Sequence, residues 1–211
     1  VPGRAAPRND AEATATGASG SAVDSADSRV TANVADTTTT SVAAGADLRA
    51  ADVLTVDAVS TVDVNTDAEV DNGGIGADAS TSSSVTTKGT TSTKIGDADL
   101  RAAAVLISAR VAGVEIDSEA DSSASALGSD SDAVSTVDTE STAALSLEKG
   151  AGITGTTRVE LLAKQSGMST DSRAYAASNS CAGATDASEL SPQSGAALRQ
   201  RAGPPSGSAH A

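Results

Sequence analysis

The chain has 211 residues and a formal net charge of −14, from 14 Lys and Arg against 28 Asp and Glu. Fewer than one position in five holds Val, Leu or Ile, and Phe and Trp are absent, so the composition lies near the lower limit for a compact globular core. A lone histidine, His210, argues against Ser-His and Cys-His catalysis, and a lone Cys181 excludes an internal disulfide and a cysteine-based zinc site. The acidic charge without stacking aromatics argues against nucleic-acid binding, and the longest apolar run, Ala102 to Ile107, is too short for membrane insertion.

Composition divides the chain into three segments. Residues 1–20 are rich in Ala, Gly, Arg and Thr without alternation and form a low-complexity N-terminal segment. Residues 21–165 contain the repeats described below, and residues 166–211 form a Ser/Ala/Gly-rich tail that we expect to be flexible. Cys181 lies in this tail, where we interpret it as incidental. Because the chain starts at Val1 rather than Met, we interpret it as a piece of a longer protein.

A 52-residue repeat organises the middle segment. The stretch Ala46 to Leu54 returns as Ala98 to Leu106, and Val62 to Ala68 returns as Val114 to Ala120 at the same offset. A finer spacing, about half of this offset, joins apolar positions in Gly/Asp/Ser-rich settings: Val23, Leu48, Ile75, Leu100, Leu127 and Ile153. This spacing predicts that each 52-residue unit makes two structural turns and that these six equivalent positions line one narrow aliphatic interior.

Local periodicity predicts strands rather than helices. From Val62 to Asp71, apolar or small residues alternate strictly with acidic or amide residues, as in a strand with one buried and one wet face. The alternative is an Ala-rich helix over residues 46–58, but its apolar residues make no clean stripe of helical period. Glycines such as Gly73 and Gly74 fall between the strand segments, where turns are expected.

Short strands, glycine turns and a repeat predict an all-β fold, a parallel β-helix (β-solenoid) with about 26 residues per turn and low-complexity ends. A narrow interior of this kind accepts Ala, Val, Ser and Thr and excludes rings. The stretch Lys94 to Ala102, followed by alternating strand residues, resembles the β-strand repeats of giant secreted bacterial adhesins of the filamentous-haemagglutinin and autotransporter type. This resemblance spans roughly residues 20–165. It implies a right-handed β-helix, an extracellular or cell-surface location, and a role as stalk or contact surface. The implied partners are host or neighbouring-cell surface molecules and neighbouring repeats of the same parent chain.

The acidic faces of two strands are the sharpest candidate site. Carboxylates stacked in register repel one another unless cations neutralise them, and calcium prefers oxygen ligands. With two turns per unit, the two acidic strands are expected to lie about 9.6 Å apart, too far to share one ion directly. The segment Gly73 to Thr81 nearly matches a calcium-binding nonapeptide and adds one aspartate, although Ser80 replaces a required apolar residue. The calcium candidates are Asp63, Asp67, Glu69, Asp71, Asp78, Glu115, Asp117, Glu119 and Asp121.

The functional prediction is a non-enzymatic structural or adhesive segment of a large extracellular repeat protein, with no cofactor beyond a calcium ion as an alternative. A second hypothesis is a disordered, acidic Ser/Thr/Ala-rich secreted or linker region. Two minor alternatives are a calcium-stabilised solenoid and an ice-binding solenoid. The latter would use the threonine-rich blocks at 37–40, 90–93 and 139–142.

Overall fold

The computed structural model describes residues 3–5, 8–20, 23–179 and 182–196. In these residues every regular element is a β-strand, which confirms the predicted all-β class. The strands in chain order are β1 (Gly3–Ala5), β2 (Arg8–Ser19), β3 (Val23–Val42), β4 (Asp47–Arg49), β5 (Val53–Gly73), β6 (Gly76–Ile95), β7 (Asp99–Ser125), β8 (Gly128–Leu147), β9 (Gly152–Gln165), β10 (Met168–Asn179) and β11 (Ala182–Ala196).

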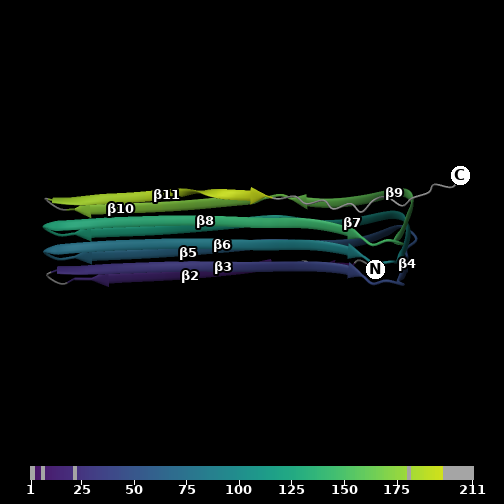
Figure 1. Cartoon of the computed structure of the whole chain (residues 1–211), viewed down its shortest axis with the longest axis horizontal. Coiled ribbons are helices and arrows are strands. Elements are labelled where there is room, and N and C mark those ends of the chain that lie inside the picture. Colours follow the sequence, from purple (N-terminus) through teal and green to yellow (C-terminus); the bar gives the residue numbers. More distant parts are fainter. Residues whose placement is uncertain (1–2, 6–7, 21–22, 180–181, 197–211) are drawn as a thin grey trace.

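The strands form two sheets, and all of the described pairings are parallel. Sheet A runs β1-β5-β7-β10, with β2 also on β5 and with β4 and β9 also on β7; sheet B runs β11-β8-β6-β3. The chain passes from one sheet to the other at every connection between these strands except β1–β2, β4–β5 and β9–β10, which stay in sheet A (Figure 1). β5 packs against β3 and β6, and β7 packs against β6 and β8, so the interior lies between the two sheets.

The register of the strand pairs gives the sequence offset between residues in neighbouring layers. Val62 pairs with Val114 in sheet A and Val85 pairs with Val137 in sheet B, in both cases 52 positions later. The predicted offset of 52 is thus the pairing distance for Thr61–Gly73 of β5 and for all of β6, whereas β3 pairs with β6 at an offset of 53. The predicted turn of half the repeat length is wrong. Half a unit is one long strand with its connection, and the next half lies in the opposite sheet.

The six apolar positions of the finer spacing therefore form no single column. Leu48, Leu100 and Ile153 are register partners at one end of the strands of sheet A, and Leu100 is completely buried. By contrast, Ile75 and Leu127 lie in the β5–β6 and β7–β8 connections and are 61% and 66% exposed. The expectation that all six line one interior is wrong, because alternate members occupy opposite ends of the strands.

The interior is narrow and only partly apolar. Its middle cluster is built on Val62, Val64, Val85, Val114 and Ile116, all buried. A second cluster, richer in Leu and Ile, fills the end near β4, and a third, built mainly of alanine, fills the other end. Many of the other inward positions are Ser and Thr, beside small residues such as Ala68 and Ala120. This sequence therefore folds with few large aliphatic side chains because hydroxyl groups occupy much of the core.

Parallel pairing extends beyond the segment that carries the repeats. β2 lies within the predicted N-terminal low-complexity segment, and β10 and β11 lie within the predicted tail. Strands β3 and β5 to β8, which have the longest pairings, contain no proline. Pro192 falls in the edge strand β11 beside an irregularity in register, where a missing N–H donor is tolerated.

Candidate functional site: the outer faces of the sheets

The outer face of sheet A carries columns of carboxylates. Asp63 pairs with Glu115, Asp67 with Glu119 and Glu69 with Asp121 across hydrogen-bonded neighbours β5 and β7. The predicted stacking is confirmed, but the predicted separation is wrong. Because β5 and β7 are adjacent strands, successive residues within each column are about 4.8 Å apart rather than twice that distance.

The structure brings eight of the nine candidate residues together. Those on β5 and β7 all point outward from sheet A, because inward Val64 and Ile116 between them are buried. Asp78 instead lies on the outer face of sheet B, next to Ser25 and Asp130 in register. The stretch Gly73 to Gly76 joins the two sheets, so it serves as a connection. In the described residues, no three His, Cys, Asp or Glu side chains converge to hold a metal ion.

One carboxylate of this face, Asp121, has a perturbed pKa. The pKa of Asp121 is raised, first by burial and then by the charges of Asp71 and Asp67. Burial favours the neutral form of a carboxyl group, and neighbouring anions act in the same direction. Ionised Asp121 is therefore disfavoured by burial and by the two neighbouring aspartates.

Sequence reasoning missed a basic residue on this face. Arg173 of β10 is the register partner of Glu119, and its guanidinium donates to Asp171 on the same strand. Its pKa is raised mainly by that hydrogen bond, with Asp117 adding to the effect. Residues Thr170 to Ala174 alternate in the same way as the acidic strand. Their offset from that strand is 54 residues, however, so they do not match the 52-residue repeat.

A shallow groove of about 470 Å³ crosses the same face. Its lining includes Gly113 and Gly167, which have no side chain, beside the hydroxyl and carboxyl groups of Thr61, Asp63 and Glu115. Two irregularities produce it: β7 has one extra residue relative to β5 at this level, and Gly167 adopts a positive φ of 70°. The groove interrupts an otherwise flat sheet.

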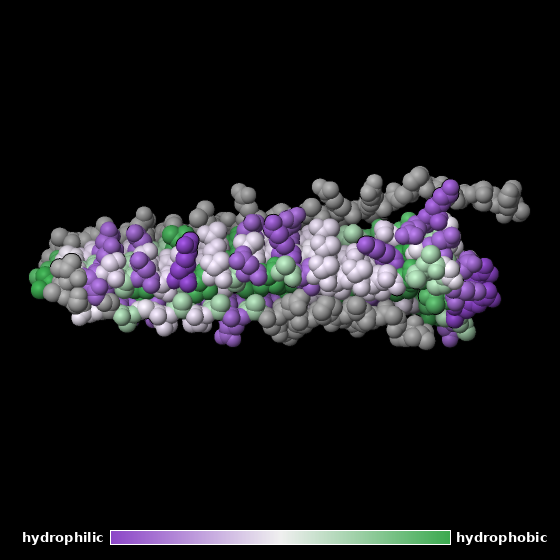
Figure 2. Space-filling model, turned by 60° about the horizontal axis from the view of Figure 1, so that its bottom comes forward, coloured by the Kyte–Doolittle hydropathy of each residue, from purple (hydrophilic) through white to green (hydrophobic). Residues whose placement is uncertain are grey.

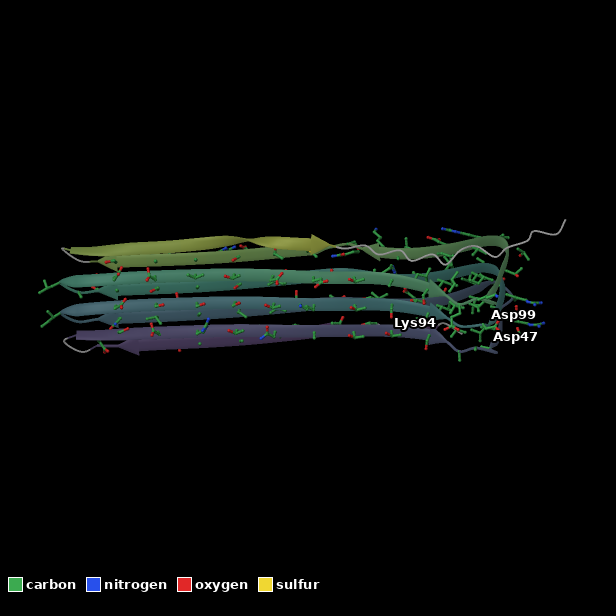
Figure 3. The ribbon with its side chains drawn as sticks, in the orientation of Figure 1. Asp47, Lys94 and Asp99 are labelled. Carbon is green, nitrogen blue, oxygen red and sulfur yellow. The ribbon has the colours of Figure 1, made fainter. Side chains whose placement is uncertain are left out.

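The end of sheet A near β4 carries mixed charges. Asp47 and Arg49 are register partners of Asp99 and Arg101, and each arginine pairs with the aspartate of its own strand. The pKa of Asp47 is lowered chiefly by its hydrogen bond from Arg49. Asp47 and Asp99 project at this end of the molecule (Figure 3). In the next layer Gly152 replaces the aspartate, and the charged column ends.

The outer face of sheet B is richer in hydroxyl groups. Across β3, β6 and β8, Thr37, Thr90 and Thr142 form one outward column of hydroxyl groups, and Thr31, Ser84 and Thr136 form another. The next register partner of Thr136 is Leu190 of β11, which has no hydroxyl group. The contiguous threonines do not all face outward, since a strand alternates its sides; Thr38, for example, is buried. Hydrophilic side chains form bands across the long axis of the molecule (Figure 2), as expected when register partners are similar.

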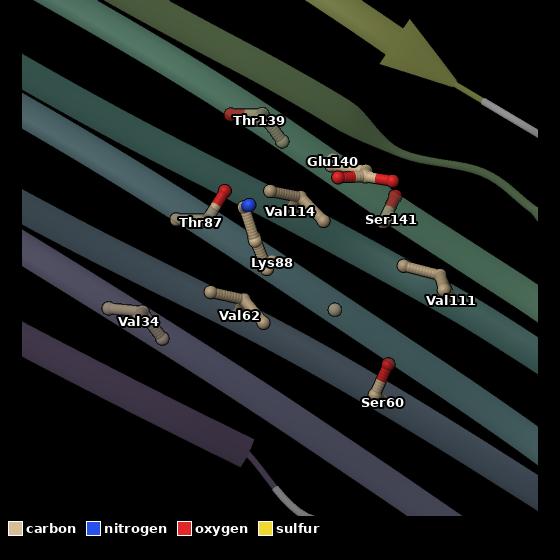
Figure 4. Close-up of a pocket in the computed structure, with 11 residues that line it drawn as sticks. Val34, Ser60, Val62, Thr87, Lys88, Val111, Val114, Thr139, Glu140 and Ser141 are labelled. Carbon is tan, nitrogen blue, oxygen red and sulfur yellow. The ribbon is translucent and has the colours of Figure 1, made fainter.

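Inside the stack, a void of about 10 Å³ lies beside Gly89. Thr87 and Thr139 line it, and both of their buried hydroxyl oxygens lack a hydrogen-bond partner (Figure 4). Val62 and Val114 close it from sheet A. The volume is about that of one water molecule.

Comparisons with known proteins add no relative. No protein-family model, no curated protein and no solved structure matches this chain. Within the described residues, no helix has the length and apolar character needed to cross a membrane. Cys181 and His210, singled out from the sequence, lie outside the described residues.

Proposed function

We propose that the chain is a β-solenoid segment of a large extracellular repeat protein and that it acts without catalysis, as a contact surface. The observation that carries the proposal is the parallel register, which presents similar outward side chains in successive layers at positions such as Asp63 and Glu115 or Thr90 and Thr142. Columns of like residues over a broad sheet are suited to recognising an extended surface rather than a small molecule.

Geometry favours a contact surface over a stalk. Each layer uses one full unit of the repeat but adds only about 4.8 Å along the stacking direction. A strand of 20 residues such as β6 spans roughly 66 Å at about 3.3 Å per residue. The long axis of the molecule therefore runs along the strands (Figure 1). Each added repeat thus contributes a wide strip of sheet surface but little length along the stacking direction, which suits a contact surface better than a stalk.

The two outer faces suit different roles. The carboxylate columns of sheet A repel anionic partners and keep a β-rich stack from associating sideways. The outer face of sheet B, with its hydroxyl columns at Thr37 and Thr31, carries fewer stacked like charges and many hydrogen-bonding groups. We therefore assign contact with host or neighbouring-cell surface molecules to sheet B and solubility to sheet A.

Adhesion of protein-coated beads to cell monolayers tests this assignment. One variant replaces each residue of a sheet B hydroxyl column with glutamine. A matched variant replaces three outward hydroxyl residues of sheet A with glutamine. The sheet B positions are Thr37, Thr90 and Thr142, and the sheet A positions are Thr14, Thr16 and Ser169. We expect the sheet B variant to lose adhesion several-fold and the sheet A variant to match wild type. Wild-type beads that adhere no better than albumin-coated beads would refute the contact role, and equal adhesion of the two variants would refute its assignment to sheet B.

A further inference from the structure

Five hydroxyl groups form a continuous hydrogen-bonded chain through the interior. Thr66 Oγ1 lies 2.9 Å from Ser83 Oγ, which lies 2.8 Å from Ser118 Oγ. Ser135 Oγ lies 3.0 Å from Ser118 Oγ and 2.8 Å from Ser172 Oγ. All five residues are buried, and four of them have no exposed surface.

The chain links every layer from β5 to β10. Its members alternate between the sheets, with Thr66, Ser118 and Ser172 in sheet A and Ser83 and Ser135 in sheet B. The same residues are register partners within each sheet: Thr66 with Ser118, Ser118 with Ser172, and Ser83 with Ser135. One set of hydroxyls therefore joins both neighbouring strands and facing sheets.

The rest of the inward pattern leaves the register poorly determined. Sliding a strand by two residues keeps every inward residue inward, because side chains alternate with a period of two. On β6 the inward residues around Ser83 are Thr81, Val85 and Thr87, which are close in size, so a slip of two changes the packing little. The same slip would move Ser83 away from both Thr66 and Ser118.

We propose that this hydroxyl chain selects the register of the stack. In the native register each member has a partner. A slip that brings Val85 to the place of Ser83 removes that partner from both Thr66 and Ser118, which is costly in an apolar interior. A second link acts in the same direction: Ser131 donates to the Ser122 hydroxyl or carbonyl oxygen, and Ser122 donates to the Ala79 carbonyl oxygen. A low-complexity sequence thereby specifies one alignment among several with similar hydrophobic burial.

The test compares two triple variants that each remove three buried hydroxyl groups from the interior. The first removes the centre of the chain with Ser83→Ala, Ser118→Ala and Ser135→Ala. The control, Thr81→Val, Thr87→Val and Thr139→Val, removes three buried hydroxyls that have no hydrogen-bond partner. Register is read from nitroxide labels on cysteines at the outward register partners Ser84 and Thr136, with Cys181→Ser to prevent labelling elsewhere.

In the native register the labelled residues are directly opposite, and a slip of two makes them diagonal neighbours at about 7–8 Å between backbones. We expect wild type and the control to give one strongly coupled spin population, and the chain variant to give an additional, weakly coupled one. One population in the folded chain variant would overturn the proposal. If circular dichroism shows that the triple variant does not fold, Ser118→Ala alone is read with the same labels. A second population then supports the proposal, and a single one overturns it.

Discussion

Replacing Gly89 by alanine should stabilise the protein. A Cβ built on Gly89 meets only the Ser141 side chain, at 3.6 Å, which is ordinary van der Waals contact, and Gly89 has no positive φ. Burying the methyl group contributes about 0.8 kcal/mol. The loss of chain freedom in the unfolded state contributes about 0.4–1 kcal/mol more. At about 2–4 °C per kcal/mol for a chain of this size, the thermal midpoint should rise by about 2–7 °C.

The matched control is Gly96→Ala, also on the interior side of the structure. There a Cβ would lie 2.8 Å from the Ala44 backbone nitrogen and 3.0 Å from the Val42 carbonyl oxygen, so backbone must move. Thermal and urea melts followed by circular dichroism should show the two variants shifting in opposite directions. A lower midpoint for Gly89→Ala would refute the reasoning, because it would mean that the void holds a water molecule on which Thr87 and Thr139 depend.

Three further predictions concern charge. Because the folded pKa of Asp121 is raised, its contribution to stability is fully present below the unfolded value of about 3.9 and is lost as pH rises through the folded pKa. Asp121→Asn should therefore raise the midpoint slightly at pH 7, and melts across pH should show that gain vanish below about pH 4; a gain that persists there would contradict the assigned cause. Arg110→Met should destabilise by about 1–3 kcal/mol in urea melts, because the Asp57 carboxylate 2.6 Å away is buried, whereas Arg49→Met at an exposed pair should change nothing measurable. Calcium and magnesium at equal millimolar concentration should raise the midpoint equally, because no three described carboxylates converge on one ion; a rise with calcium alone would reveal a specific site.

Strand identity and the repeat could be predicted from local residues. The alternation from Val62 to Asp71 places alternate side chains on opposite faces of a strand whatever that strand pairs with. The return of Asp47-Leu48-Arg49 as Asp99-Leu100-Arg101 predicted an offset that the register confirms. For the same reason, the grouping of acidic residues on one face of each strand was predicted correctly.

The candidate site was predictable in membership but not in geometry. Sequence reasoning identified the acidic residues of β5 and β7, yet it placed the strands two layers apart and it missed Arg173. The distance between Asp63 and Glu115 depends on which strands pair, and pairing is a long-range property. Asp78 was added to these carboxylates because residues 73–81 resemble a calcium-binding nonapeptide, although the connection at Gly74 carries it to the other sheet.

The sequence by itself determined which segments are strands, which side of each strand is wet, and the offset at which equivalent residues recur, because these properties follow from neighbouring residues and simple periodicity. Only the tertiary structure decided that one unit makes a single circuit through two facing sheets, with Leu100 buried at one end and Ile75 exposed at the other. A spacing of half a unit fits one long strand as well as one short turn. The two arrangements differ in whether the chain, after each glycine-containing connection, returns to the same sheet or crosses to the opposite one. That choice depends on interior contacts such as Ser83 with Ser118, which are 35 positions apart in the sequence.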